Sequence, residues 1–168
     1  MSGIRNMENL KKSIVVLGGG CFWCVEAVLQ RLKGVSEVVP GYAGGKVPGT
    51  PTYREVCSGL TGHAEVVRVV FDTQLVSYET ILEVFLTTHD PTTLNRQGAD
   101  VGTQYRSVIF YSSPEEEKNA AAVIHKLSPL FSTPIVTTLE PFIQFFKAES
   151  EHSDYYNNHS NQGYCQVV

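Results

Sequence analysis

The sequence lacks any long hydrophobic run. The longest early apolar segment, residues 14–17, is too short for the core of a signal peptide, and no stretch approaches the length that spans a bilayer. We therefore expect a cytoplasmic protein.

The sequence also lacks a cluster of basic residues. Its 13 Lys and Arg are outnumbered by 17 Asp and Glu, for a formal net charge of −4. Nothing supplies the positive surface that a phosphate backbone or an anionic membrane attracts. We expect neither nucleic acid nor a membrane as a partner.

Cysteine is scarce, with four residues in the chain, Cys21, Cys24, Cys57 and Cys165. They are too few and too unevenly spaced for the disulfide framework of a secreted protein. In a reducing compartment such cysteines bind a metal or carry out transient redox chemistry. The histidines show no metal-ligand spacing, and residues 18–23 and 41–46 do not match nucleotide-binding fingerprints. We expect no cofactor and no metal.

A chain of 168 residues with 42% hydrophobic composition suits one globular domain. Residues 1–12 show no periodicity and are predicted to form a mobile arm before a catalytic domain at 13–168, whose end, 149–168, is loop-rich. Long ordered loops are predicted at 41–61 and 91–104. The order of elements indicates an α+β fold, a two-layer sandwich of sheet and helices. The predicted strands are 14–17, 65–71, 107–111, 135–139 and 142–146, and the helices begin near Cys21, Ser77 and Ser113.

Cys21 follows a strand and three glycines and lies at the start of a helix. Backbone N–H groups and the positive end of the helix dipole stabilise a thiolate there, so Cys21 is the expected nucleophile. Cys24 lies one turn further on. The pair alone leaves open a thioredoxin-type dithiol oxidoreductase or a non-enzymatic zinc-binding module, although zinc normally needs a second ligand pair.

Four motifs carry a resemblance: Gly-Cys-Phe-Trp-Cys-Val-Glu-Ala at 20–27, Pro-Thr-Tyr-Arg-Glu-Val-Cys-Ser-Gly at 51–59, Thr-Gly-His-Ala-Glu at 61–65 and Gly-Thr-Gln-Tyr-Arg-Ser at 102–107. In this order they resemble the peptide methionine sulfoxide reductase A family. The resemblance implies reduction of the S epimer of methionine sulfoxide, free or in oxidised proteins, as a repair of oxidative damage. It also implies thioredoxin as the reductant, and we expect a monomer.

The resemblance assigns roles to individual residues. Cys21 attacks the sulfoxide sulfur, and Phe22 and Trp23 hold the S-methyl group. The residues that grip and protonate the sulfoxide oxygen are Glu65, Tyr53 and Tyr105, and Asp100 completes the polar side of the pocket. Cys57 lies in a motif where the family tolerates a cysteine without a redox duty, so we expect a structural role for it.

The chemistry requires such residues. A sulfoxide oxygen leaves only after it takes a proton, so thiolate attack needs an acid at that oxygen. Strand alternation places Glu65 on one face with Val67, Val69 and Phe71, where burial keeps a carboxyl protonated. The oxidised Cys21 then condenses with a second thiol. Both Cys24 and Cys165 are candidates, and a disulfide relay through both would pass oxidation outward.

Overall fold

A mixed six-stranded sheet forms the centre of the structure. The computed structural model describes residues 12–152, and within this range the sheet has the order β7-β6-β1-β3-β2-β8. Neighbouring strands are antiparallel, except for β6 and β7, which are parallel. The strands are β1 (Lys12–Gly19), β2 (Val35–Ala43), β3 (Ala64–Asp72), β6 (Ser107–Tyr111), β7 (Thr138–Pro141) and β8 (Phe145–Lys147), and a separate hairpin pairs β4 (Arg96–Gln97) with β5 (Asp100–Val101).

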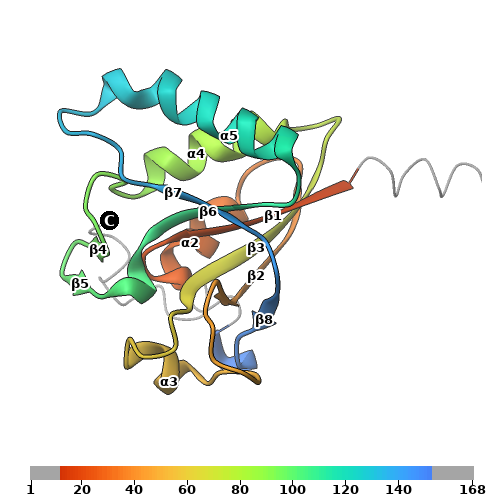
Figure 1. Cartoon of the computed structure of the whole chain (residues 1–168). Helices are drawn as coiled ribbons and strands as arrows, with labels where there is room; N and C mark the ends of the chain where they lie inside the picture. Colours follow the sequence, from red (N-terminus) through yellow and green to blue (C-terminus); the bar gives the residue numbers. More distant parts are fainter. Residues whose placement is uncertain (1–11, 153–168) are drawn as a thin grey trace, which may run out of the picture.

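Three helices pack on one face of the sheet: α2 (Phe22–Leu29), α4 (Tyr78–Thr88) and α5 (Pro114–Leu127). The large hydrophobic core lies between these helices and the sheet. The segment that carries β7 and β8 crosses the other face (Figure 1), where Phe142 and Phe145 cover a smaller apolar cluster. The predicted α+β class is confirmed.

The alternation of β3 decides which of its side chains reach the helices. Val67, Val69 and Phe71 are fully buried in the large core, whereas Val66 belongs to the small cluster on the opposite face. Glu65 shares the alternation of the first three and therefore points toward the helix-covered face, as its sequence pattern predicts.

Two helix starts form as their capping residues predict. The Ser77 hydroxyl accepts the Thr80 amide N–H at 3.0 Å at the start of α4. At the start of α5 the Ser113 hydroxyl accepts the Glu116 amide N–H at 3.2 Å, and Pro114 occupies the first turn, where its missing N–H costs nothing.

The prediction of a continuous loop over residues 41–61 is wrong in two places. Strand β2 continues to Ala43, and α3 (Tyr53–Cys57) is a helix of five residues. A capping box holds α3, because the Thr52 hydroxyl accepts the Glu55 amide N–H and the Glu55 carboxylate accepts that of Thr52.

Other boundaries also differ from the prediction. Helix α2 ends at Leu29, and β7 and β8 begin later than predicted. The part of the chain that the structure describes also contains three short 3-10 helices: η1 (Thr103–Tyr105), η2 (Ser128–Leu130) and η3 (Ser150–His152). The predicted arm, up to residue 11, and the chain after His152 lie outside the described residues.

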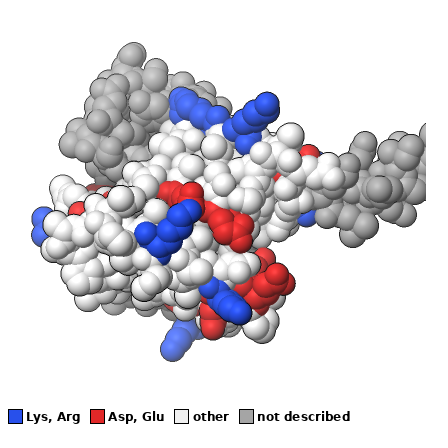
Figure 2. Space-filling view, turned by 90° about the horizontal axis from the view of Figure 1, so that it is seen from above, with Lys and Arg blue, Asp and Glu red and all other residues white. Residues whose placement is uncertain are grey.

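Charges of both signs are mixed on the face of the molecule that Figure 2 shows. Seen from above, Lys and Arg side chains lie beside Asp and Glu side chains, and neither sign covers the face alone (Figure 2). Over the stretch 12–152, none of the helices has the length and apolar character to cross a membrane.

Candidate active site

Cys21 lies between β1 and α2, at a turn that requires glycine. A Cβ on Gly19 would come within 2.8 Å of the Phe85 ring, and Gly20 adopts a φ of +92°, a conformation that suits glycine. The chain therefore reverses tightly against α4 and leaves Cys21 as the N-terminal cap of α2, with 8% of its surface exposed.

The environment of the Cys21 thiol differs from the prediction. Burial raises its pKa well above the usual value for cysteine, and the nearby Glu65 carboxyl raises it further. The backbone N–H groups of Trp23 and Cys24 lower the pKa, as expected at a helix start, but they are outweighed. The helix start alone therefore does not make Cys21 a thiolate in the resting protein, because desolvation is the larger effect.

Glu65 is almost completely enclosed, with 1% of its surface exposed. Its Oε1 accepts the Phe22 amide N–H at 3.3 Å, and its Oε2 is buried without a hydrogen-bond partner among residues 12–152. Burial raises the Glu65 pKa to about 8, with a smaller upward contribution from Asp100, while the Phe22 N–H lowers it. At neutral pH the carboxyl is therefore largely protonated and has a hydrogen to donate.

Tyr53, Tyr105 and Asp100 lie around this carboxyl. Burial raises the pKa of both tyrosines, and the nearby charge of Glu65 raises it further. Asp100 also has a raised pKa, because it is partly desolvated. The structure thus brings together the three polar residues that the sequence placed with Glu65, and the tyrosine hydroxyls stay protonated across the physiological range.

Cys57 lies closer to the site than the sequence suggested. Burial raises its pKa most, while hydrogen bonding by the hydroxyls of Tyr53 and Tyr105 lowers it. The end of α3 therefore presents a half-buried free thiol to the two tyrosines.

Phe22, Trp23 and Tyr53 form an aromatic wall with a fourth member that the sequence did not indicate. The His152 ring stacks on Trp23 at 5.7 Å between centroids and meets Tyr53 edge-on at 4.5 Å. The Trp23 indole N–H donates to His152 Nδ1 at 3.1 Å. Phe22 is fully buried beside Trp23 and also belongs to the core.

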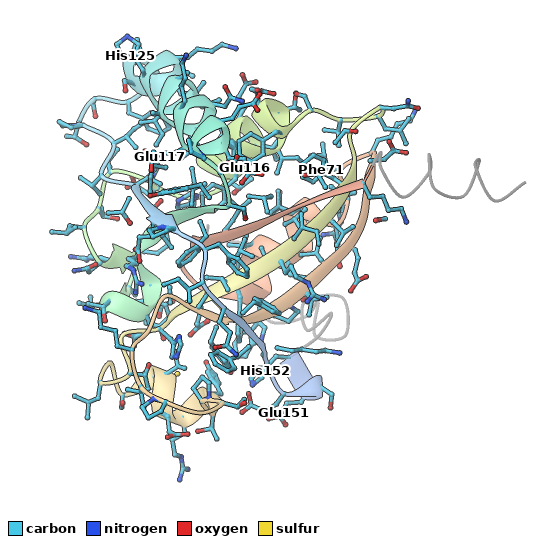
Figure 3. The ribbon with its side chains drawn as sticks, turned by 45° about the vertical axis from the view of Figure 1, so that its right-hand side comes forward. Phe71, Glu116, Glu117, His125, Glu151 and His152 are labelled. Carbon is cyan, nitrogen blue, oxygen red and sulfur yellow. The ribbon has the colours of Figure 1, made fainter. Side chains whose placement is uncertain are left out.

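Glu149 is a second residue that the sequence left unassigned. One carboxylate oxygen accepts the Tyr42 hydroxyl and the other accepts the Tyr53 amide N–H, both at 2.9 Å. Figure 3 shows His152 beside the sheet, far from His125 on α5. The pattern Glu149-x-x-His152 lies in a polar stretch without periodicity, so no local signal in the sequence singled it out.

One group of possible metal ligands occurs among residues 12–152. Ligand atoms of Glu149, Glu151 and His152 lie within 4.8 Å of one another. Glu149 already accepts two hydrogen bonds, and exposed acidic groups such as Glu151 are common without a bound ion, so we assign no cation to this group.

Three of the four cysteines lie in the described part of the chain. Cys21 and Cys57 are free thiols, whereas Cys24, 7% exposed, is disulfide-bonded. Cys165 lies outside the described residues. The two neighbouring cysteines thus differ in state: Cys21, the cap of α2, is a free thiol, and Cys24, in the first turn of α2, is bonded.

Comparison with known proteins shows which protein family has this arrangement. Residues 13–168 match the family model described as peptide methionine sulfoxide reductase. The chain belongs to this family. It is 56% identical to peptide methionine sulfoxide reductase MsrA of Nitratiruptor sp. over 153 residues, covering 91% of this chain and 87% of the relative. It is 53% identical to the enzyme of Saccharolobus solfataricus over 155 residues, covering 92% and 87%.

Solved structures agree with this membership in the peptide methionine sulfoxide reductase family. Reduced Mxr1 from Saccharomyces cerevisiae superposes with a TM-score of 0.87 at 32% identity, covering 91% of this chain and 88% of that one. The protein is thus a thiol-dependent oxidoreductase that reduces methionine sulfoxide. Neither a general dithiol oxidoreductase nor a zinc-binding module accounts for these matches.

Proposed function

We propose that Cys21 is the nucleophile of this reductase and that Glu65 is the acid that protonates the sulfoxide oxygen. The observation that carries this assignment is the bond from the Phe22 amide N–H to Glu65, 3.3 Å long. It joins the first residue of α2 to a buried carboxyl whose pKa is about 8, directly beside the Cys21 thiol. The backbone directly after the nucleophile therefore also holds the acid, through this hydrogen bond.

The reaction moves one oxygen atom from substrate to enzyme. The Cys21 sulfur attacks the sulfoxide sulfur while Glu65 gives its proton to the oxygen. The sulfur–oxygen bond of the substrate breaks, methionine leaves as the thioether, and Cys21 keeps the oxygen as a sulfenic acid. The Cys21 thiol proton returns to Glu65, so the carboxyl is neutral again at the end of the step.

Tyr53, Tyr105 and Asp100 form the polar side of the pocket in this proposal. The two hydroxyls remain protonated because burial raises the pKa of both tyrosines, so each can donate a hydrogen bond to the sulfoxide oxygen. Donors fixed in a dry pocket stabilise the developing charge more than mobile water does.

Phe22 and Trp23 form the opposite, apolar side. We assign to them the methyl group of the substrate, since Phe22 is fully buried and Trp23 is held by His152. With the methyl on one side and the oxygen on the other, only one configuration at sulfur presents its rear to Cys21. We propose that this is the S epimer.

Regeneration needs a second thiol. We propose that the Cys21 sulfenic acid condenses with Cys24 or Cys165, releasing water, and that the other of the two passes the disulfide to thioredoxin. Support comes from the disulfide that Cys24 already forms while Cys21 is free. Yeast Mxr1 has also been crystallised in complex with Trx2, in a structure that shares the fold with this chain.

We propose oxidised proteins and free methionine sulfoxide as substrates of a monomeric, cytoplasmic enzyme. Nucleic acids and membranes are not expected to bind, because the chain carries a net charge of −4 without a basic cluster.

The experiment that tests the nucleophile uses the two enantiomers of methyl p-tolyl sulfoxide. Reduced protein is expected to consume the S enantiomer and leave the other, and Cys21→Ser is expected to consume neither. Cys57→Ser is the matched control, because it replaces the other free thiol of the described chain. Undiminished turnover by Cys21→Ser would rule out the assignment.

Peptide mapping tests the relay. The protein is first reduced, so that Cys24 is a thiol, and the reductant is removed. After a single turnover, a disulfide from Cys21 to Cys24 or to Cys165 is expected, and its partner identifies the resolving residue. A Cys21 sulfenic acid that persists in every molecule contradicts both routes.

A further inference from the structure

Arg106 directly follows Tyr105 and directly precedes β6. It lies in the motif Gly-Thr-Gln-Tyr-Arg-Ser, whose tyrosine the proposed function uses and whose arginine it leaves without a role. Only 13% of its side chain is exposed, which is low for a guanidinium group.

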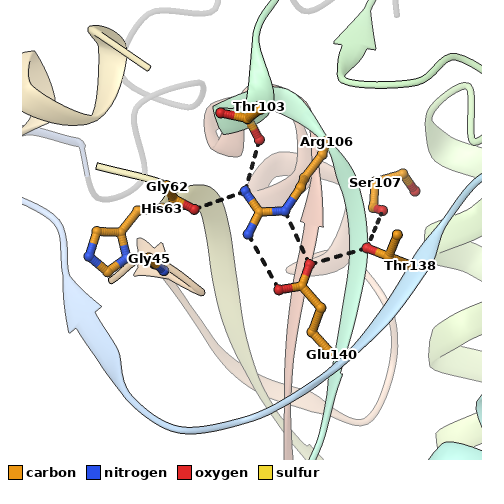
Figure 4. A network of polar contacts seen from close by, with 8 residues as sticks. All are labelled: Gly45, Gly62, His63, Thr103, Arg106, Ser107, Thr138 and Glu140. Atoms are coloured by element: carbon orange, nitrogen blue, oxygen red, sulfur yellow. Dashed lines mark hydrogen bonds and ion pairs between the residues drawn. The ribbon is translucent and has the colours of Figure 1, made fainter. Parts of the chain in front are cut away.

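The Arg106 guanidinium joins three segments of the chain (Figure 4). Nε and Nη2 donate to the Glu140 carboxylate at 3.1 and 3.5 Å. Nη1 donates to the carbonyl oxygens of Gly62 and Thr103, at 3.1 and 2.9 Å. The Thr138 hydroxyl donates to the same carboxylate at 3.2 Å, so Glu140 is itself held in place on β7.

The two carbonyl groups that Arg106 binds belong to the segments that carry Tyr105 and Glu65, which the proposed function places at the sulfoxide oxygen. Thr103 is the first residue of η1, and Tyr105 is its last. Gly62 lies two residues before the start of β3 and three residues before Glu65. By binding both carbonyls with one nitrogen, Arg106 sets the distance between the segment that carries the tyrosine and the segment that carries the acid.

This site is built for a guanidinium. Its planar fork of donors reaches a carboxylate and two carbonyls at once, which a lysine ammonium cannot reproduce. Gly44 makes room for it, because a Cβ there would lie 2.6 Å from Arg106 Nη2. A partly buried ion pair such as that of Arg106 and Glu140 contributes little net stability, so precise placement is the better reason for keeping it.

We propose that Arg106 is a positioning residue that holds the Tyr105 hydroxyl in register with the Glu65 carboxyl during protonation of the sulfoxide oxygen. The proposal rests on the proposed function, because it assigns to Arg106 an effect that acts through Tyr105. Arg106 touches neither the substrate nor the reacting sulfur in this scheme.

A double-mutant cycle tests it in the whole chain. Arg106→Met keeps the length of the side chain and removes its donors, and we expect kcat to fall about tenfold with a smaller change in KM. In a Tyr105→Phe background the same substitution is expected to cost less than about twofold, because no hydroxyl remains to be positioned. Arg106→Lys should recover little of the loss.

Each outcome separates the proposal from general destabilisation. Equal losses from Arg106→Met with and without the Tyr105 hydroxyl would overturn it, since the arginine would then act by another route. If Tyr105→Phe is as fast as the unaltered enzyme, the proposed role of Tyr105 fails, and with it this proposal. If wild type leaves both enantiomers of the sulfoxide untouched, it is the proposed function that fails.

Two further variants control for folding. Glu140→Gln keeps an acceptor oxygen and removes the charge, so it tests the same contact if Arg106→Met does not fold, and its loss should also shrink in the Tyr105→Phe background. Arg68→Met is the matched control, because Arg68, on β3, also forms an ion pair with a glutamate, Glu37, at 3.6 Å. Its kcat is expected to stay within about twofold of wild type.

Discussion

The amide nitrogen of Phe22 donates a hydrogen bond of 3.3 Å to Glu65, a residue 43 positions later in the chain. This bond fixes the start of α2, which follows Cys21, relative to β3, which carries the acid. Because Glu65 Oε2 has no partner in the described structure, the carboxyl keeps one oxygen available for a substrate.

Glu65→Gln is expected to retain the fold and slow sulfoxide reduction by roughly a hundredfold or more, the usual contribution of a general acid. The amide can still accept the Phe22 N–H but cannot give up a proton. In wild type, kcat/KM should fall above pH 8, because the Glu65 pKa is about 8. Steady-state rates from pH 6 to pH 10 check both, and an unchanged rate in the variant would leave protonation to the tyrosines or to water.

The same substitution should make the protein more stable at high pH. The Glu65 pKa is raised from 4.5 to about 8 on folding, so the unfolded chain loses this proton while the native protein keeps it. Native stability therefore falls as pH rises from 4.5 to 8. Glu65→Gln removes this loss, and at pH 8 its free energy of unfolding should exceed that of wild type by several kcal/mol, on the order of 4. Urea unfolding at pH 5 and pH 8 measures it.

His89 is expected to limit stability on the acid side. It is buried, its ring nitrogens contact the Phe85 carbonyl and the Ser107 hydroxyl at 2.7 Å each, and burial lowers its pKa from 6.5 to about 4. The unfolded chain gains a proton below pH 6.5, and the native protein gains it only near pH 4. Stability should therefore drop by about 3 kcal/mol between these values.

Urea unfolding of His89→Gln between pH 7 and pH 4 checks this contribution, because glutamine does not titrate. The variant should lose less stability over this range than wild type. His125→Gln, at an exposed position of α5, is the control and should show the same change of stability with pH as wild type. Parallel curves for wild type and His89→Gln would show that other groups carry the effect.

His152→Phe should weaken substrate binding more than it slows chemistry. Phenylalanine keeps the ring that stacks on Trp23 but removes the nitrogen that accepts the indole N–H at 3.1 Å. The loss of one such bond, about 1 kcal/mol, corresponds to a KM raised about fivefold. His152→Asn reverses the loss, because its amide oxygen takes the place of Nδ1 while the ring is removed. A KM equal to that of wild type in His152→Phe would show that stacking alone orients Trp23.

Much of the fold follows from local patterns that tertiary contacts do not override. Residues 65–71 alternate strictly, and that alternation correctly placed Glu65 with Val67 on the helix-covered face. The Ser113 and Glu116 pair correctly marked the start of α5. The second strand was missed because Pro40 and Gly41 are typical of loops. Pro40 is tolerated because it lies where the pairing of β2 with β8 ends: its carbonyl still accepts the Ala148 N–H at 2.9 Å, and only the missing N–H is lost to the sheet.

The site was less accessible to prediction where it depends on three-dimensional surroundings. A helix start favours a thiolate in any sequence, but the burial that outweighs it at Cys21 appears only when Glu65 packs against α2. The Thr52 and Glu55 capping box was present in the sequence and could have revealed α3. His152 offered no such signal, because its role depends on contact with Trp23, 129 positions away.

The contacts of Glu149 and His152 also bear on when the enzyme becomes active during its synthesis. These two residues hold Tyr53 and Trp23 from the far end of the described chain. Contacts between such distant positions form late, because the intervening chain must first be ordered. A growing chain on the ribosome therefore lacks part of its aromatic wall until residue 152 has emerged from the exit tunnel, so the site cannot be complete before that point.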